Sequence, residues 1–219
     1  MARRPRIDLG GYIYHITARG NNGQDIFLDS RDYERYLANL RKTKEKYQYL
    51  LYAYVLMTNH LHLLLRPQLD GTVSKVMQTL NTAYTMYFNR KYERYGHLFQ
   101  GRFKSFLVEE EPHLIELSRY IHLNPVRVGM VQKTEEYQYS SYISYLKEES
   151  DDLVDTTDIL SRFGKRKEIQ IKRYKVFVEE ARQRKIYKPY EQLKDDRFLG
   201  SEEFRNKILM WQVNGGEEV

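Results

Sequence analysis

Cysteine is absent from the 219 residues of the chain, and long apolar runs are missing as well. Without thiols there is no disulfide scaffold, no thiolate zinc site and no cysteine nucleophile. The longest apolar-rich stretch, about residues 49–65, is interrupted by Asn59, His60 and His62, so it does not predict a membrane span. The first six residues lack the apolar stretch of a secretory signal. These absences predict a soluble, cytoplasmic protein without a membrane partner.

The composition is instead rich in positive charge and in tyrosine. Lysine and arginine total 36 against 30 aspartates and glutamates, which gives a formal charge of +6 and a pI near 9.2. This balance favours a polyanionic partner such as nucleic acid, although many other proteins are equally basic. The 20 tyrosines suit surfaces that stack bases, and they suit the edges of a hydrophobic core equally well.

The residue pattern predicts an α+β fold. Strands are expected at residues 12–17, 49–57, 61–66 and 103–108, and helices at 29–47, 72–94 and 112–124. Asn124-Pro125 is expected to end the last helix. The first six elements follow the order β, α, β, β, α, β, which matches the ferredoxin-like, RRM-like arrangement of one antiparallel sheet with helices on one face.

A change in composition after Leu146 predicts a second unit. Residues 147–152 are polar and mostly charged, which is typical of a linker. Three helices are expected beyond it, at residues 155–163, 167–185 and 201–211, and the middle one is basic. The predicted domains are therefore residues 1–146 and a helical carboxy-terminal appendage at 147–219. The appendage has three open interpretations: a duplex or hairpin DNA binder, a dimer contact, or a stabilising cover.

His60-Leu61-His62 is the sharpest local pattern. Alternate residues of a strand point to the same face, so both imidazoles can converge on one ion while Leu61 points to the opposite face. Imidazole is a common ligand of divalent metals. The competing interpretation is a pair of surface histidines on a sheet, and the spacing alone does not separate the two.

Tyr120 and Asn124 form a second pattern, because residues four apart share one face of a helix. An asparagine amide oxygen can complete a metal site, and a tyrosine hydroxyl beside it can attack a phosphodiester. In the competing interpretation Tyr120 packs in the core and Asn124 caps the helix. His122, two residues from Tyr120, points away from that face and is a weaker ligand candidate. We expect structural or supporting roles for His113 and Glu116, and packing for His15.

Four segments together resemble a known family. YVLMTNHLHLL at residues 54–64 resembles the HUH motif of single-strand DNA transposases that use one catalytic tyrosine. RYIHLNPVR at 119–127 resembles the tyrosine helix of their REP-associated branch, the REP-associated tyrosine transposases of the IS200-like family. YHITARGN at 14–21 and GHLFQGRF at 96–103 also fit that branch, in the same order. The similarity extends over about residues 3–145.

The resemblance implies a bacterial enzyme, acting at the nucleoid, that cleaves and rejoins single-stranded DNA carrying a REP-like hairpin. Tyr120 matches the nucleophile, which forms a 5′-phosphotyrosine bond and frees a 3′-hydroxyl. His60, His62 and Asn124 match the ligands of a Mg²⁺ or Mn²⁺ ion. The alternative is a domesticated relative that only binds DNA or regulates a gene. Monomer and homodimer both stay open.

Basic and aromatic residues near these motifs are candidate DNA contacts, since cations can follow the backbone and rings can stack on bases. A solvated basic surface is the competing interpretation for each of them. The candidates are Arg3, Arg4, Arg6, Arg19, Arg102, Phe103 and Lys104. A histidine-triad nucleotide hydrolase would need a third histidine where Leu64 stands, and no RNP-type aromatic signature supports an RNA-binding module.

Overall fold

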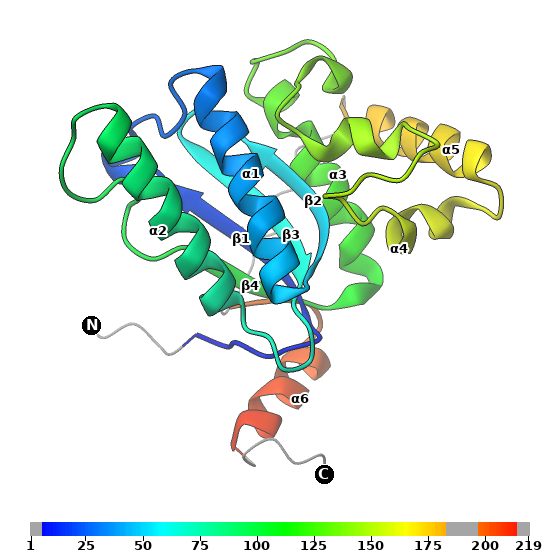
Figure 1. Ribbon diagram of the computed structural model, residues 1–219. Coiled ribbons are helices and arrows are strands. Elements are labelled where there is room, and N and C mark those ends of the chain that lie inside the picture. Colours follow the sequence, from blue (N-terminus) through cyan, green and yellow to red (C-terminus); the bar gives the residue numbers. More distant parts are fainter. Residues whose placement is uncertain (1–5, 183–196, 214–219) are drawn as a thin grey trace.

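A five-stranded sheet organises the chain, of which the computed structural model describes residues 6–182 and 197–213 (Figure 1). The strands are β1 (Ile13–Arg19), β2 (Leu50–Leu56), β3 (His60–Arg66), β4 (Lys104–Val108) and β5 (Phe198–Leu199). Their order is β2-β3-β1-β4-β5, and all neighbours are antiparallel except β4 and β5, which are parallel. The first four strands have the predicted ferredoxin-like order, and the α+β fold class is confirmed.

The two helices between these strands are α1 (Ser30–Tyr47) and α2 (Val73–Lys91), which lie side by side on one face of the sheet (Figure 1). Local capping explains where they begin. At the start of α1, the Asp29 carboxylate accepts a hydrogen bond from the Asp32 amide, and the Asp32 carboxylate accepts one from the Asp29 amide. At the start of α2, the Thr72 hydroxyl accepts a hydrogen bond from an amide of the first turn.

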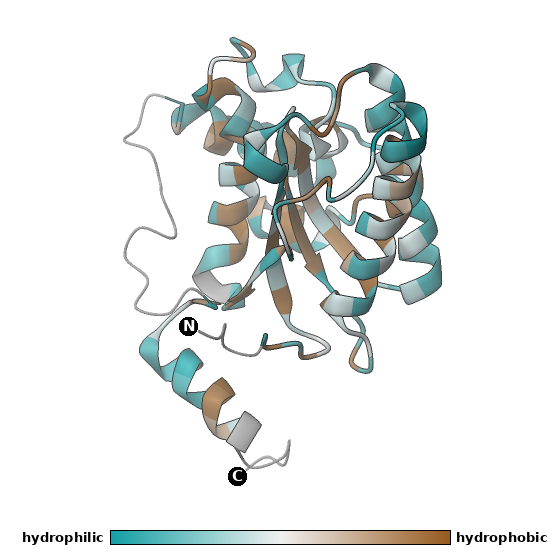
Figure 2. Cartoon of the chain, turned by 90° about the vertical axis from the view of Figure 1, so that its left-hand side faces the viewer, coloured by the Kyte–Doolittle hydropathy of each residue, from teal (hydrophilic) through white to brown (hydrophobic). Residues whose placement is uncertain are grey.

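α3 (Glu110–Arg127) lies on the opposite face, so that Figure 2 shows the sheet edge-on between two helical layers. The predicted end of this helix at Asn124 is wrong, because Pro125 lies inside the helix. Proline removes one amide donor, but its own carbonyl and that of the residue before it still find partners. The Val128 amide donates to the Asn124 carbonyl at 3.2 Å, and the Met130 amide donates to the Pro125 carbonyl at 2.9 Å.

The predicted helices beyond residue 147 are present, although the middle one ends before its predicted limit at residue 185. They are α4 (Thr157–Leu160) with the 3-10 turn Ser161–Phe163 after it, α5 (Lys167–Glu180) and α6 (Glu202–Val213). The Asp155 carboxylate accepts hydrogen bonds from the Leu51 amide of β2 and from Lys44 Nζ, both at 2.7 Å. The described residues of this segment thus share one core with residues 6–146. The division into two domains stays a prediction. Within the described ranges, no helix meets the length and hydropathy that crossing a bilayer requires.

A buried histidine joins α3 to the carboxy-terminal segment. His122 Nδ1 lies 2.8 Å from the Tyr174 hydroxyl of α5, and His122 Nε2 lies 2.8 Å from Ser141 Oγ. The Tyr174 hydroxyl donates onward to Ser118 Oγ at 3.0 Å, so Nδ1 carries the ring proton and donates to Tyr174. Burial lowers the pKa of His122 to about 3, which keeps this imidazole neutral. Both nitrogens therefore bond within the core, which agrees with His122 being the weaker ligand candidate.

We expect His122 to make the protein sensitive to acid. The unfolded chain binds a proton on this imidazole below about pH 6.5, whereas the folded protein binds it only near pH 3, so acid favours unfolding. Between pH 7 and pH 5 the free energy of unfolding should fall by about 2 kcal/mol more in the wild type than in His122→Gln. Denaturant unfolding at both pH values measures this difference. Equal losses in the two proteins would contradict the assignment.

Candidate active site

His60 and His62 lie at the start of β3, on the face of the sheet that α3 covers. In the antiparallel pairing of β1 with β3, His62 is opposite Thr17 and His60 is opposite Arg19. Directly opposed residues share a face, so these four side chains form two neighbouring rows. The two imidazole rings are 5.2 Å apart and nearly perpendicular, at 84°. The convergence predicted from the spacing is therefore geometrically possible.

Each of these imidazoles has its Nδ1 atom bonded to another side chain. His60 Nδ1 lies 2.7 Å from Asn59 Oδ1, and the Asn59 amide nitrogen donates to the Gly23 carbonyl at 3.3 Å. An amide oxygen only accepts, so His60 Nδ1 carries the proton and Nε2 keeps its lone pair. His62 Nδ1 lies 2.9 Å from His15 Nε2, and the two rings are stacked at 5.1 Å and 9°. In both histidines Nε2 is thus the nitrogen that remains for a metal.

Burial keeps the histidines of this site neutral. It lowers the pKa of His62 well below its usual value, and the neighbouring His15 and His60 lower it further. Burial and the charge of Arg19 lower the pKa of His60, while burial lowers that of His15 to about 3. A metal binds the neutral imidazole, so these shifts leave both candidate ligands in the competent protonation state at neutral pH.

Tyr120 and Asn124 face this histidine pair from α3. The Tyr120 ring lies 5.8 Å from the His62 ring and perpendicular to it, at 88°. The Asn124 amide nitrogen donates to the Tyr120 carbonyl at 3.1 Å, which leaves its amide oxygen as the candidate ligand atom. Burial raises the pKa of Tyr120, while a hydrogen bond with Asn124 and the charge of Arg127 act in the opposite direction. The Arg127 guanidinium carbon lies 5.5 Å from the centre of the tyrosine ring.

One cavity of about 730 Å³ brings these residues together. Its walls come from the end of β1, the start of β3 and the second half of α3. The residues that line it are Thr17, Ala18, Arg19, Met57, Thr58, Asn59, His60, His62, Tyr120, Asn124, Val128 and Met130. The sequence predicts Tyr120, the two histidines and Asn124 as a group, and the structure places all four in this cavity.

His60 and His62 can hold a divalent ion only together with a third ligand, and that ligand has to be a neutral group. Among the described residues no three histidine, aspartate or glutamate side chains cluster as they do in a metal site. An ion held by His60 and His62 would therefore take its third protein ligand from the amide of Asn124. Two neutral imidazoles and an amide oxygen form an acceptable donor set for a divalent metal that keeps open positions for a substrate.

The predicted DNA contacts fall into three groups. Arg3 and Arg4 lie outside the described residues. Arg19 lines the cavity, and Lys104 is exposed on β4 opposite Thr17, in the same row as His62. Arg102, two residues before Lys104, is exposed as well. Arg19, Arg102 and Lys104 are therefore placed where they could contact the phosphates of a DNA strand that enters the cavity.

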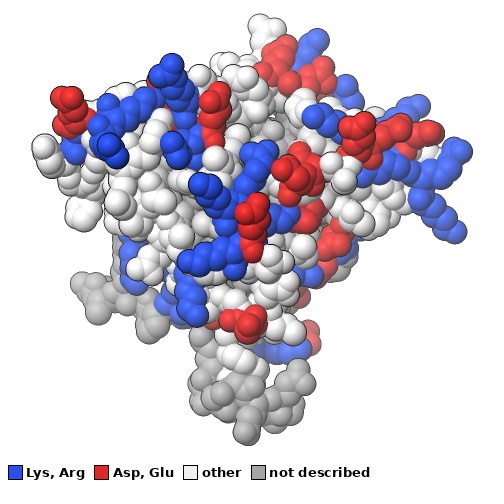
Figure 3. Space-filling view, in the orientation of Figure 1, with Lys and Arg blue, Asp and Glu red and all other residues white. Residues whose placement is uncertain are grey.

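Arg6 and Phe103 instead contact each other. The Arg6 guanidinium carbon lies 3.7 Å from the centre of the Phe103 ring, and Arg6 donates a hydrogen bond of 2.7 Å to the Phe103 carbonyl. This pair attaches the amino-terminal segment to the start of β4. On the far side of the sheet, over α1 and α2, acidic and basic side chains are interspersed (Figure 3). Neither sign of charge dominates that face, so charge gives no reason to place the DNA contacts there instead of at the cavity.

Sequence reasoning missed the contribution of His15 and Asn59. His15 was expected to pack, and it does stack near Phe106 at 6.1 Å, but its Nε2 atom also bonds to a candidate ligand. The missing information was the register between β1 and β3, which no local pattern reveals. Of the other candidates, Glu116 forms an ion pair with Arg119 one turn along α3.

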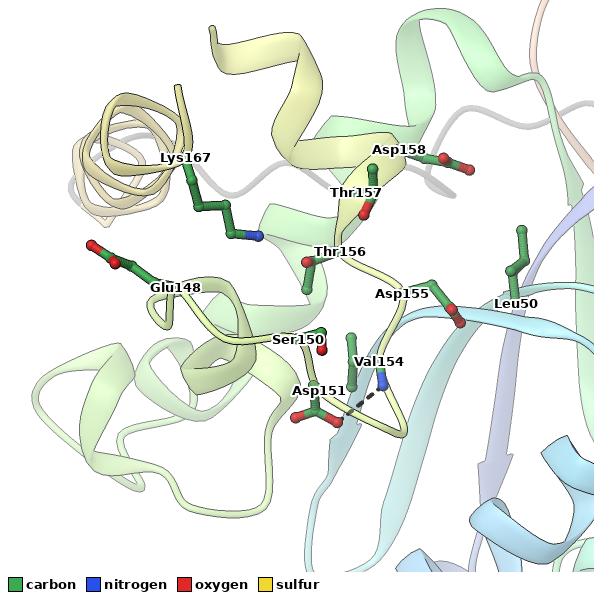
Figure 4. Close-up of a pocket in the computed structure, with 10 residues that line it drawn as sticks. All are labelled: Leu50, Glu148, Ser150, Asp151, Val154, Asp155, Thr156, Thr157, Asp158 and Lys167. Carbon is green, nitrogen blue, oxygen red and sulfur yellow. Dashed lines mark hydrogen bonds between the residues drawn. The ribbon is translucent and has the colours of Figure 1, made fainter. Parts of the chain in front are cut away.

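A second pocket of about 330 Å³ lies between β2 and the segment after residue 147 (Figure 4). Its acidic side chains serve the fold. The Asp151 carboxylate accepts hydrogen bonds from the Leu153 and Val154 amides at 2.8 and 3.1 Å. The Asp158 carboxylate accepts one from the Tyr52 hydroxyl at 2.8 Å. These bonds account for Asp151 and Asp158 without a ligand, so the first cavity remains the candidate active site.

A family model described as "Transposase IS200 like" matches residues 9–124, more than half of the chain and the part that contains the candidate site. The protein therefore belongs to the IS200-like transposase family. A Haemophilus influenzae protein named "Putative REP-associated tyrosine transposase" is 28% identical over an alignment of 119 residues, and the match covers 50% of this chain and 68% of that protein. The resemblance to the REP-associated branch is thereby confirmed.

The fold has a solved counterpart. A REP-associated tyrosine transposase bound to a REP hairpin superposes with a TM-score of 0.59 at 18% sequence identity. The match covers 71% of this chain and 94% of the other. At this level of identity the likeness concerns the fold, and it agrees with the ferredoxin-like sheet described above.

Proposed function

We propose that this protein is a metal-dependent single-strand DNA endonuclease and strand transferase with Tyr120 as its nucleophile. The observation that carries the proposal is the shared cavity, in which the tyrosine of α3 faces two neutral histidines of β3. In a member of the IS200-like transposase family, this is the chemistry that such an arrangement supports. The DNA-binding interpretation without catalysis is the outcome that the experiment below tests.

The proposed metal ligands are Nε2 of His60, Nε2 of His62 and the amide oxygen of Asn124, and the ion is Mg²⁺ or Mn²⁺. When bound, the ion supplies Lewis-acid stabilisation of charge on the scissile phosphate. The residues around it orient the ligands: Asn59 holds the His60 ring, and His15 holds the His62 ring. Such partners fix the tautomer and the ring orientation of metal-binding histidines.

The proposed reaction exchanges one phosphodiester for another. The Tyr120 oxygen forms a bond to phosphorus while the bond from phosphorus to the 3′ oxygen breaks. The phenolic proton ends on the departing 3′-hydroxyl of the upstream fragment, and the downstream fragment stays on the protein as a 5′-phosphotyrosine. A second 3′-hydroxyl reverses the step and joins the strands, so no ATP is consumed. Because burial raises the pKa of Tyr120, its resting side chain is the protonated phenol.

We propose hairpin-bearing single-stranded DNA as the substrate. The solved relative named above is bound to a REP hairpin, and Arg19 and Lys104 place positive charge at the cavity and beside it. The work would take place at the bacterial nucleoid. Tyr120 and both histidines of a single chain line one cavity, so one chain suffices for a complete site. We therefore favour a catalytically competent monomer.

Covalent attachment to DNA is the direct test. With Mg²⁺ or Mn²⁺ and labelled single-stranded DNA carrying a REP-like hairpin, we expect a protein–DNA adduct that survives denaturing electrophoresis. Tyr120→Phe should abolish the adduct and leave DNA affinity within about twofold, because only the nucleophilic oxygen is lost. His60→Ala should form no adduct, whether or not the metal is added, because a proposed metal ligand is lost.

Tyr139→Phe is the matched control, since Tyr139 stacks on Tyr33 at 3.6 Å and lies outside the cavity. It should form the adduct normally. An adduct that persists in Tyr120→Phe would show that another tyrosine is the nucleophile. DNA binding without any adduct would replace the proposed enzyme by a DNA-binding protein.

Metal affinity tests the role of His15. His15→Phe keeps a ring beside His62, but phenylalanine cannot accept a hydrogen bond from His62 Nδ1. Because the His62 ring then loses the partner that orients it, the binding of Mn²⁺ should weaken roughly 10- to 100-fold. His15→Gln restores an acceptor and should recover most of the affinity. Calorimetry or Mn²⁺ paramagnetic resonance on the protein without DNA measures both.

His122→Gln replaces an equally buried histidine outside the cavity and should leave Mn²⁺ affinity unchanged. Thermal melting of every variant separates lost metal binding from lost folding. Equal Mn²⁺ affinity in His15→Phe and the wild type would show that His15 only packs.

A further inference from the structure

The connection between α2 and β4 presents an unusual side chain. Tyr95 is 97% exposed, and it is the one aromatic residue in the described ranges that is exposed rather than buried or partly buried. A single exposed apolar residue is common on protein surfaces and needs no partner by itself. What distinguishes Tyr95 is the backbone that carries it and the place where that backbone lies.

Hydrogen bonds on both sides of Tyr95 hold this connection in one conformation. The Arg94 amide donates to the Asn89 carbonyl at 2.9 Å, and the Asn89 side chain donates to the Gly96 carbonyl at 3.0 Å. The Arg94 side chain donates to Gln24 Oε1 at 2.6 Å and so ties the connection to the loop after β1. The exposed ring therefore stands on a fixed support.

The backbone next to Tyr95 is also strained. Glu93 has a φ of 51° and Gly96 a φ of 89°, so left-handed residues lie on both sides of the tyrosine. A left-handed conformation is costly for glutamate and is maintained only when the surroundings enforce it. Apart from the adjoining residues, an atom added at Gly96 would have no neighbour within 4 Å, and the Tyr95 side chain beside it is almost fully exposed.

The same connection adjoins the candidate active site. The Gln100 amide donates to the Arg19 carbonyl at 2.8 Å, Phe99 pairs with Gly20, and Arg19 lines the cavity. Tyr95 precedes Phe99 by four residues, which limits the distance between their Cα atoms to about 14 Å. Figure 1 shows this connection beside the loop that follows β1.

We infer that Tyr95 stacks on an unpaired base of single-stranded DNA that leaves the cavity past Arg19. The inference rests on the proposed function, because it concerns the path of the same substrate. Arg19 and the exposed Arg102 and Lys104 supply cations for the backbone along this edge. A fixed, exposed tyrosine can receive a base whose faces are free, whereas the bases of a duplex are stacked on one another.

The test uses the full chain carrying Tyr120→Phe, so that DNA binds without cleavage. Hairpin DNA with a single-stranded flank should bind roughly tenfold more weakly when Tyr95→Ala is added, and Tyr95→Phe should preserve the affinity because phenylalanine also stacks. With 2-aminopurine placed along the flank, one position should be quenched with Tyr95 present and brighter with Tyr95→Ala. Met86→Ala is the matched control, since Met86 is 68% exposed on α2.

Blunt hairpin DNA without a flank should bind equally well to the proteins with Tyr95 and with Tyr95→Ala. Equal affinities for the flanked DNA would overturn the stacking contact and leave the proposed function standing. Equal weakening for blunt and flanked DNA would overturn the assignment to single strands. Absence of any DNA binding by the Tyr120→Phe protein would overturn the inference and the proposed function together.

Discussion

The antiparallel register between β1 and β3 is the constraint on which the site depends. It sets Thr17 opposite His62 and Arg19 opposite His60, and it brings His15 within hydrogen-bonding distance of His62. Side chains of a strand alternate between faces, so a slip of one residue would turn every one of these groups to the other side. The buried Leu61, Leu63 and Leu65 of β3, which face the opposite core, oppose such a slip. Hydrophobic burial thus fixes the geometry of a polar site.

The sequence was informative where local periodicity decides the outcome. The period of two predicts that His60 and His62 share a face, and a spacing of four predicts the same for Tyr120 and Asn124. Ordered motifs then joined the two pairs through a family resemblance. The element order was enough for the ferredoxin-like sheet, because each helix and strand has its own cap or burial pattern.

The features that sequence reasoning missed depend on contacts between distant residues. The bond between His15 and His62 joins positions 47 residues apart, and only the register reveals it. Asp155 bonds to Leu51 across 104 residues, which packs a segment that composition suggests is separate against β2. Pro125 is a local signal that gave a wrong helix end, since later amides satisfy the carbonyls around it. At such positions, hydrogen bonds in the folded protein override the local helix propensity of the residues.

Burial shifts the pKa values of this site in two directions with one result. It lowers those of His60 and His62 and raises that of Tyr120, so all three side chains are neutral at neutral pH. Arg127 and Arg19 are charged groups close to these side chains, and both are cations. Because the charged groups near this cavity are cations, it disfavours a metal ion that binds alone. It favours a metal ion that binds together with the anionic DNA backbone. On the proposed function, metal ion and phosphodiester would therefore strengthen each other's binding, and free protein would hold the ion only weakly.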